Sequence, residues 1–324
     1  MLTVKTYQSS DYKLWNSFVA EAKNATFLFQ RDFMEYHKDR FTDGSLLIFK
    51  ADKLIGILPG NTVDSVLHSH QGLTYGGLVL NKTLKLNDTI EAFKVLLKFL
   101  ETNNIKTLHI KNIPSIYNLV PSEELDYILF LLNASITRTD VLSVIENNTV
   151  SQPVSKVRTR GVKRAEALDL EIKEDENFKA FWEDVLKPNL QEKYNKKPVH
   201  SLEEIIQLQH KFPKNIRQFN VYYKNEIVAG TTIFETKNVA HAQYISAKEN
   251  KQELGSLDFL FNHLINTTFK NKKYFDFGIS NENNGKKLNQ GLLYWKESFG
   301  ARTITQQFYS ISTKNHKLLN NVML

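Results

Sequence analysis

The segment from Tyr274 to Gly300 decides the fold, because a strand, a loop and a helix follow one another in it. It begins Tyr274-Phe-Asp-Phe-Gly-Ile-Ser280 and ends, after a turn rich in Asn and Gly, with Leu288-Asn-Gln-Gly-Leu-Leu-Tyr-Trp-Lys-Glu-Ser-Phe-Gly300. Clustered aromatic residues are typical of a buried strand, and an Asn/Gly turn is typical of a polar loop. The closing residues predict a short helix that ends at Gly300.

The same order of elements occurs twice along the chain. The first copy consists of a helix over 31–41 and two strands within 45–59. The second consists of a helix over 203–212 and two strands within 218–234. In both copies a helical period gives way to two strands of alternating pattern that a short polar turn connects.

Each copy is predicted to continue with a crossover helix and a further strand. In the first half the helix spans 88–103 and the strand 105–110. In the second half a strand at 240–246 precedes a helix over 256–269, which leads to the strand at 274–277. Strands joined by a crossover helix favour a mixed sheet with helices packed on it. We therefore predict an α/β fold of the α+β mixed-sheet kind, duplicated in tandem; one larger α+β domain is the alternative.

Length and composition agree with two domains. A chain of 324 residues with 41% hydrophobic residues exceeds the usual size of one core. We place the domains at 1–150 and 151–324, because the segment 147–153 has turn and loop character. No stretch of the sequence approaches the roughly 20 apolar residues of a membrane span, and no secretory signal is visible, so we expect a cytoplasmic protein.

Composition also limits the chemistry. The absence of cysteine excludes disulfides, thiolate zinc sites and cysteine nucleophiles. The sequence contains neither a Walker loop nor a Rossmann glycine pattern, and no His/Asp/Glu cluster indicates a metal. The net charge of +7 suits an anionic partner such as CoA, tRNA or a lipid surface, or simply a solvated surface rich in Lys. The oligomeric state cannot be read from these features.

The densest basic run opens the second half and reads Lys156-Val-Arg-Thr-Arg-Gly-Val-Lys-Arg164. As a helix it would bring Arg160 close to Lys163 and Arg164, because residues three or four apart share a face. One interpretation is a phosphate-binding face in which Arg160 contacts the acceptor. A solvated basic linker helix is the alternative.

Taken together, the duplicated plan, the basic segment and the terminal helix resemble the FemAB-like branch of the GNAT superfamily, which has two tandem acyltransferase domains. In residues the resemblance is concentrated at 229–230, 241–245, 255–258, 275–280 and 294–300. It implies that an amine attacks an activated acyl group directly, without an acyl-enzyme intermediate. FemAB-type enzymes take the acyl group from aminoacyl-tRNA to build peptide branches on peptidoglycan precursors, whereas relatives use acyl-CoA.

The resemblance therefore predicts an N-acyltransferase. It would transfer an acetyl or longer acyl group from acyl-CoA to an amine of an amino sugar, amino acid or cell-envelope precursor, either small or nucleotide-linked. One alternative is an aminoacyl-tRNA-dependent enzyme that builds peptidoglycan bridges, and another is an inactive tandem GNAT protein that only binds its ligand. A nucleic-acid-binding protein would also account for the charge, but no diagnostic motif accompanies it.

The stretch Gln252-Glu-Leu-Gly255-Ser-Leu257 resembles the pyrophosphate-binding loop of GNAT enzymes. The resemblance implies that Gln252, Gly255 and Ser256 bind the donor, since the N-terminus of a helix offers unpaired amides and a positive dipole end. Leu257 departs from the small residue of the family pattern, and Glu253 adds a negative charge near the expected phosphates. The alternative is that Ser256 only caps a helix.

The terminal helix supplies two catalytic candidates. Tyr294 resembles the GNAT tyrosine that protonates the leaving group, and Lys296 resembles a lysine that FemAB-type enzymes place on this helix. A cation there would stabilise the negative charge that develops on the acyl oxygen. A surface aromatic residue and a lysine favoured by the helix dipole are the alternatives. Glu282, in the preceding loop, is a candidate base.

The strand over 240–246 carries polar residues among apolar ones. Period-two alternation predicts that His241, Gln243 and Ile245 share one face and that Ala242 and Tyr244 share the other. We interpret His241 as a candidate base and Gln243 as an acceptor contact that lines a cleft. A hydrogen-bonded core histidine is the alternative.

Further polar residues complete the predicted site. Asp276 lies between two phenylalanines and needs a partner if it is buried, so it would either orient His241 or hold the following loop. Ser280 in that loop is a candidate contact for the acceptor. In the first half, His70 and Tyr75 lie in a segment punctuated by glycines and are the remaining acceptor candidates, with a tight turn as the alternative.

Overall fold

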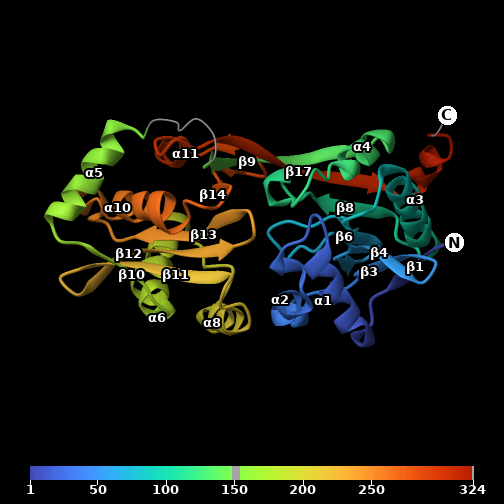
Figure 1. The fold of residues 1–324 in the computed structure, drawn as a ribbon, viewed down its shortest axis with the longest axis horizontal. Helices are drawn as coiled ribbons and strands as arrows, with labels where there is room; N and C mark the ends of the chain where they lie inside the picture. The colour runs from blue at the N-terminus through green and yellow to red at the C-terminus, as the bar shows by residue number, and fades with distance from the viewer. Residues whose placement is uncertain (148–153, 323–324) are drawn as a thin grey trace. The chain divides into compact units, whose positions relative to one another are not determined.

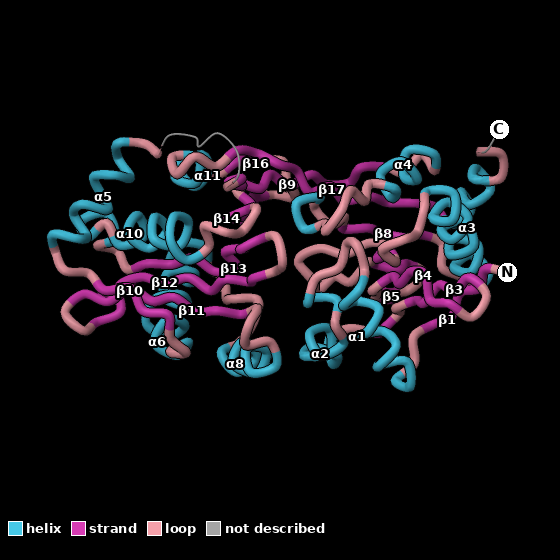
Figure 2. Tube along the Cα trace, in the orientation of Figure 1, coloured by secondary structure: helices cyan, strands magenta, loops and turns pink. Residues whose placement is uncertain are grey.

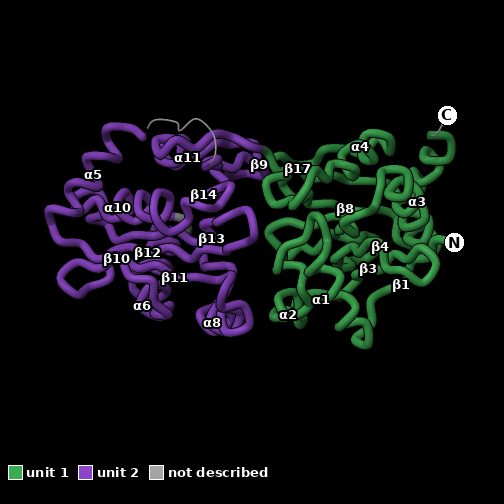
Figure 3. The backbone as a smooth tube through the Cα atoms, in the orientation of Figure 1, with its two compact units in different colours: residues 1–140, 305–324 green, residues 141–304 purple. Residues whose placement is uncertain are grey.

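Two compact units make up the chain. The computed structural model describes residues 1–147 and 154–322. One unit comprises residues 1–140 and 305–324, and the other comprises residues 141–304 (Figure 3). A mixed α/β arrangement of strands and helices forms each unit, as the sequence predicted.

The end of the chain differs from the predicted division into 1–150 and 151–324. Residues 305–324 belong to the first unit rather than the second. The reason is that strand β17 (Arg302–Ser312) pairs antiparallel with β8 (Thr107–Lys111). Apart from Asn147, the predicted linker at 147–153 lies outside the described residues.

The first unit contains strands of two sheets. One sheet has the order β1-β3-β4-β7, with bounds Leu2–Thr6, Leu46–Lys50, Lys53–Leu58 and Val79–Leu80. In the other sheet β17 is followed by β8, β6 (Val66–His68), β5 (Asn61–Val63) and β2 (Thr42–Asp43). The helices of this unit are α1 (Tyr12–Glu21), α2 (Arg31–Met34), α3 (Leu86–Thr102) and α4 (Glu124–Leu131), and β9 (Ser135–Glu146) follows α4.

Helix α3 supplies much of the core of the first unit and agrees with the predicted helix to within two residues. Its buried residues recur at three- and four-residue intervals, as in Phe93, Leu96 and Leu100. They belong to one cluster with Ile48 of β3 and Leu108 of β8. The helix is therefore held by its apolar face.

The sheet of the second unit has the order β10-β11-β12-β13-β14-β9. The bounds of the first five strands are Glu171–Glu174, Ile216–Tyr223, Glu226–Glu235, Val239–Ala247 and Tyr274–Ile279. Helices α5 (Lys156–Ala167) and α10 (Ser256–His263) cover one face, and α6 (Phe178–Phe181) and α8 (Leu202–Lys211) cover the other (Figures 1 and 2). The other α-helices described in this unit are α7 (Lys187–Tyr194), α9 (Lys251–Leu254) and α11 (Gln290–Glu297), and the other strands are the short pair β15 (Asn281–Glu282) and β16 (Lys287–Leu288).

A bulge in β13 makes the predicted alternation of this strand wrong. Thr232 pairs with Tyr244 but its neighbour Ile233 pairs with Ala242, so Gln243 has no partner in the β12 register. The extra residue reverses the faces beyond it. Ala242 consequently shares the core cluster with Ile245 rather than with Tyr244.

Strands β13 and β14 separate soon after they meet. Their parallel pairing covers only Val239 to His241 on β13 and Tyr274 to Asp276 on β14. Beyond it, Gly278 has a φ of +73°. The bulge at Gln243 and the turn at Gly278 thus lie just past the last paired residues, where the two strands part.

Two predicted helices end earlier than expected. The helix over 31–41 is an α-helix only to Met34, and a 3-10 helix with a non-helical His37 (φ −126°, ψ 28°) follows it. This departure accompanies the packing of the His37 ring against Tyr36 and Phe41. Helix α10 ends at His263 and continues as a π-helical turn to Thr268.

Among the described residues, no helix has both the length and the apolar character needed to cross a membrane.

Candidate active site

Lys296 is a buried cation at the end of α11. Only 2% of its surface is exposed. Its Nζ atom donates hydrogen bonds to the carbonyl oxygens of Gly278, at 3.0 Å, and Ile279, at 2.6 Å. Burial lowers the pKa of Lys296 to about 8, although the charge of Asp276 acts in the opposite direction. Near neutral pH the side chain is therefore still mostly an ammonium ion that carbonyl dipoles hold in place.

His241 and Asp276 form a hydrogen-bonded pair on the adjacent strands β13 and β14. His241 Nδ1 lies 2.9 Å from Asp276 Oδ2, and Asp276 is completely buried. An ionised carboxylate can only accept hydrogen bonds, so Nδ1 is the donor. In the neutral form of the ring the lone pair is then on Nε2. The pair therefore presents a nitrogen that can accept a proton.

Gly278 connects this pair to Lys296. Its amide donates to Asp276 Oδ1 at 2.7 Å, while its carbonyl accepts from Lys296. Its φ of +73° favours glycine, and a Cβ atom there would lie 3.2 Å from Cε1 of His241. The structure thus brings the predicted residues Lys296 and His241 together through Asp276 and Gly278.

Tyr294 lies on the same helix but points elsewhere. It is 60% exposed, and it is separated from Lys296 by two positions, which places the two side chains on different faces of α11. Helix α11 itself is anchored by Trp295, whose ring packs edge-on against Phe261 and Phe277.

The loop candidates occupy two different environments. Ser280 is buried, and its Oγ lies 3.4 Å from that of Ser143. Glu282 is exposed in β15 and accepts a hydrogen bond from Asn289 at 3.3 Å.

Gln243, at the bulge of β13, is partly buried, and its Oε1 atom has no hydrogen-bond partner among the described residues.

The predicted donor loop is packed beneath α5. A Cβ atom added to Gly255, whose φ is +68°, would lie 2.1 Å from the carbonyl oxygen of Gly161. Ser256 is completely buried, and its hydroxyl has no partner in the described part of the chain. The backbone carbonyl of Gln252 accepts a hydrogen bond from Arg164. In this arrangement Gly255 and Ser256 contact protein rather than solvent.

The basic segment is helical as predicted, but its arginines differ in their surroundings. Arg160 is exposed. Arg158 donates instead to Asp258 of α10 at 2.5 Å. Burial raises the pKa of Asp258 and Arg158 opposes this effect. No local pattern in the sequence indicates this ion pair, because its members are 100 residues apart.

The two candidates in the first unit are both buried. His70 has a φ of +63°, and its Nδ1 atom has no hydrogen-bond partner among the described residues. Tyr75 donates to the hydroxyl of Thr26 at 3.0 Å. Neither side chain lies on an exposed surface of this structure.

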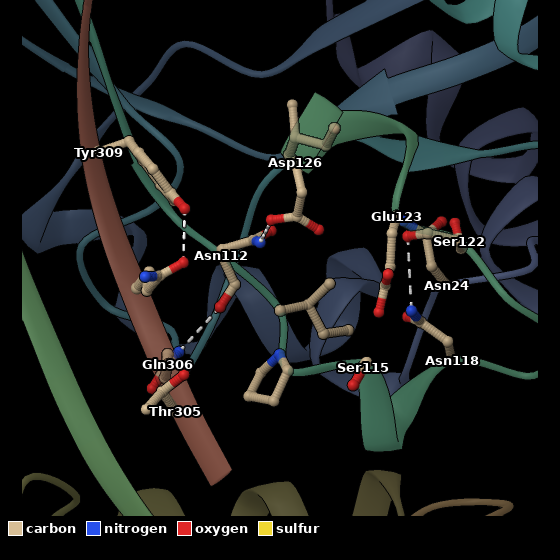
Figure 4. Close-up of a pocket in the computed structure, with 14 residues that line it drawn as sticks. Asn24, Asn112, Ser115, Asn118, Ser122, Glu123, Asp126, Thr305, Gln306 and Tyr309 are labelled. Carbon is tan, nitrogen blue, oxygen red and sulfur yellow. Dashed lines mark hydrogen bonds between the residues drawn. The ribbon is translucent and has the colours of Figure 1, made fainter. Parts of the chain in front are cut away.

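The first unit also has a polar hollow of about 290 Å³ that the sequence analysis did not predict (Figure 4). Asn112 donates to Asp126 across it at 2.9 Å, and Gln306 donates to the carbonyl of Asn112 at 3.1 Å. Burial, with help from the nearby Glu123, raises the pKa of Asp126. The only sequence signal was the density of Asn and Ser over 112–118.

Within 1–147 and 154–322, no group of three or more His, Asp or Glu side chains is placed to hold a metal ion.

No protein-family model and no curated protein matches this chain. Solved structures do match it over nearly its whole length. FemX aligns over 98% of this chain and 99% of its own, with 10% identity and a TM-score of 0.67. The C-terminal domain of a putative lysylphosphatidylglycerol synthetase from Agrobacterium fabrum aligns over 96% and 94%, with 10% identity and a TM-score of 0.60. A tandem GNAT protein from the clavulanic acid biosynthesis pathway aligns over 97% and 99%, with 9% identity and a TM-score of 0.50.

These similarities confirm the predicted fold. The chain shares its fold with FemX and with the tandem GNAT protein. At identities of 9 to 10% the structural similarity shows a common fold, and a fold does not by itself imply a reaction.

Proposed function

We propose that this protein is an acyltransferase that joins an acyl group from an activated donor to an amine. The observation that carries the proposal is the buried ammonium of Lys296, bound to the carbonyls of Gly278 and Ile279. It lies beside the His241–Asp276 pair where β13 and β14 separate. A fixed cation next to a proton acceptor suits addition of an amine to a carbonyl group.

In the proposed reaction the lone pair of the amine attacks the acyl carbon, and a C–N bond forms while negative charge develops on the carbonyl oxygen. Lys296 has three N–H donors, of which two bind backbone carbonyls, so the third would bind this oxygen. Collapse of the intermediate breaks the bond between the acyl carbon and the sulfur or oxygen of the donor. The amine proton passes to Nε2 of His241 and then to solvent. Tyr294, which is exposed, would protonate the leaving group and recover its proton from water.

Three other residues complete the proposal. The free Oε1 atom of Gln243 would accept a hydrogen bond from the acceptor amine. Glu282, on the exposed loop, is the second candidate base. Arg160 would attract an anionic part of either substrate.

The donor in this proposal is acyl-CoA, which Gln252, Gly255 and Ser256 would bind at the N-terminus of α10. One observation favours a second candidate, an aminoacyl-tRNA. Gly161 of α5 lies directly against Gly255, and Ser256 is buried, so CoA would reach these amides only if α5 moved. An aminoacyl ester reacts at the same carbonyl without requiring that loop.

For the acceptor we propose the amine of an amino sugar, an amino acid or a cell-envelope precursor in the cytoplasm. The fold similarity to FemX and to a lysylphosphatidylglycerol synthetase supports the envelope precursor within this group.

A binding experiment followed by a transfer assay tests the proposal. The melting temperature would be measured with acetyl-CoA, longer acyl-CoAs and free CoA, and with charged and uncharged tRNA, since a ligand of the folded state raises it. The ligand that stabilises the protein would then be supplied with a labelled acyl group and a panel of amines. We expect amide formation that Lys296→Met slows by about 100-fold or more. Lys287→Met, an exposed control in β16, should leave its rate unchanged. Binding without any transfer would leave a ligand-binding protein instead.

A further inference from the structure

We infer that Asp276 is a positioning residue that sets the tautomer of His241 and, through Gly278, the place of Lys296. The catalytic meaning of this inference rests on the proposed function. The effect of Asp276 on the His241 tautomer and on the Lys296 position does not depend on that function. The two oxygens of the carboxylate are divided between the two groups. Oδ2 accepts from His241 Nδ1 at 2.9 Å, and Oδ1 accepts from the Gly278 amide at 2.7 Å.

The position of Asp276 is itself rigid. It pairs in register with His241 on one side and with Val144 of β9 on the other, so it lies inside the sheet. Its neighbours Phe275 and Phe277 belong to the core cluster of the second unit. A side chain that the backbone holds on both sides can fix the groups bound to it.

Through its hydrogen bond to Gly278, Asp276 also affects the position of Lys296. Gly278 is bonded through its amide to Asp276 and through its carbonyl to Lys296 Nζ, at 3.0 Å. These two bonds lie on either side of the Gly278 Cα atom, whose φ is +73°. If Asp276 released the amide, the carbonyls that hold Lys296 would lose their fixed direction.

Charge provides a second link. The carboxylate of Asp276 on β14 favours the charged form of Lys296, whereas burial opposes it. His241 on β13 is the other titratable group in this cluster, and it is bound to the same carboxylate. Asp276 therefore acts on the base by a hydrogen bond and on the cation by its charge.

A fully buried carboxylate is costly unless it is well paired. Asp276 is completely buried, and both of its oxygens accept hydrogen bonds, one from His241 and one from the Gly278 amide. It is not part of the apolar cluster that contains Phe275 and Phe277, because successive side chains of a strand point to opposite faces. The hydrogen bonds that offset the burial of Asp276 are therefore the same ones that orient His241 and Gly278.

Asp276→Asn tests the inference with little change in size. The Asn oxygen can still accept from Gly278, but its NH₂ group can only donate to His241 Nδ1, which would move the ring proton to Nε2. Nitrogen NMR of the histidine ring, assigned with His241→Gln, would detect this change of tautomer. We expect Nδ1–H in the wild type and Nε2–H in Asp276→Asn.

The second readout is the titration of Lys296, followed by carbon NMR of labelled lysine and assigned with Lys296→Met. Loss of the negative charge should move this titration to lower pH. The matched control is Asp175→Asn, because Asp175 also accepts hydrogen bonds from Asn220 and Tyr222 in the second unit. It should change neither readout.

The third readout is kinetic. If transfer is observed, Asp276→Asn should lower kcat by about 100-fold or more, the range of general-base catalysis, with little change in KM. In a His241→Gln background, Asp276→Asn should lower kcat much less, because the histidine ring that Asp276 orients is then absent. Additive effects in the two backgrounds would overturn the coupling.

These readouts separate two kinds of failure. If the wild type transfers no acyl group, the proposed function fails, while the NMR measurements still decide the role of Asp276. If the tautomer and the lysine titration are both unchanged in a folded Asp276→Asn, the inference is wrong. If that variant does not fold, the tautomer of His241 in the wild-type protein still tests the inference. A proton on Nε2 in the wild type would contradict the hydrogen bond from Nδ1 to Asp276.

Discussion

Gly161 of α5 and Gly255 at the start of α10 are in direct backbone contact. A Cβ atom on Gly255 would lie 2.1 Å from the Gly161 carbonyl oxygen, and one on Gly161 would lie 2.0 Å from Oδ2 of Asp258. Close approach of two helices at glycines requires that neither residue carry a side chain. The contact holds α5 over the loop where the sequence predicted donor binding.

Gly161→Ala is expected to destabilise the protein by about 1 to 3 kcal/mol, the usual cost of overpacking. The new methyl group would displace Asp258 and weaken its ion pair with Arg158. Urea unfolding measures the change. Gly291→Ala is the control, because its Cβ would meet nothing nearer than 3.9 Å in α11 and should be neutral or slightly stabilising.

Lys296→Met is expected to reduce kcat by about 100-fold or more if Lys296 stabilises the oxyanion, the effect of losing one such donor. The unbranched side chain of methionine is one atom shorter than that of lysine and cannot donate to the carbonyls of Gly278 and Ile279. The assay is acyl transfer at saturating substrates. A rate equal to that of the wild type would remove Lys296 from the reaction.

The pKa of Lys296, lowered by burial to about 8, predicts two effects of pH. Transfer should decline as the pH rises through about 8, because the cation is lost. The free energy of unfolding should instead increase with pH. Between pH 8 and the ordinary lysine value near 10.5, the unfolded chain binds more protons than the folded chain does. Unfolding therefore becomes less favourable as the pH rises through this range. Both dependences should be absent from Lys296→Met, which pH–rate profiles and urea titrations would reveal.

His37 predicts a loss of stability in acid. Burial lowers its pKa to about 4, and neither ring nitrogen has a partner among the described residues. Between the ordinary value of 6.5 and about 4, the unfolded chain binds a proton that the folded one does not, so stability falls as the pH falls. One such group contributes at most about 1.4 kcal/mol per pH unit.

His37→Leu should reduce this slope, whatever its effect at pH 7. Urea unfolding at several pH values between 4 and 7 measures it. The control is His210→Leu, because His210 is exposed on α8. Equal slopes in the wild type and His37→Leu would contradict the prediction.

Tyr294→Phe should separate catalysis from stability. The side chain is 60% exposed, so the free energy of unfolding should change by less than about 0.5 kcal/mol. If Tyr294 protonates the leaving group, kcat should still fall by about 100-fold. The loss should be smallest for the donor whose leaving group is the weakest base. An unchanged rate would leave Tyr294 as an ordinary surface residue.

Local patterns in the sequence predicted much of this fold. The repeated order of helix, hairpin and crossover helix depends on periodicity within short segments, and it appears in α8, α3 and the strands beside them. The basic run 156–164 is helical for the same reason. His241 was selected by its position in a strand pattern and Lys296 by a family resemblance. The structure connects both to Asp276, His241 directly and Lys296 through Gly278.

Contacts between distant segments required the tertiary structure. The bulge at Gln243 reverses the faces of β13 through its register with β12, which no alternation within the strand reveals. The return of residues 305–324 to the first unit depends on pairing with β8, nearly 200 residues earlier.

The sequence by itself determined the elements, their duplication and the residue types available for catalysis, because these follow from local spacing and side-chain chemistry. Only the tertiary structure decided that Lys296 is buried, that Asp276 joins it to His241, and that α5 covers Gly255. Burial, pKa and close packing depend on what surrounds a residue, and those surroundings come from segments far apart in the chain.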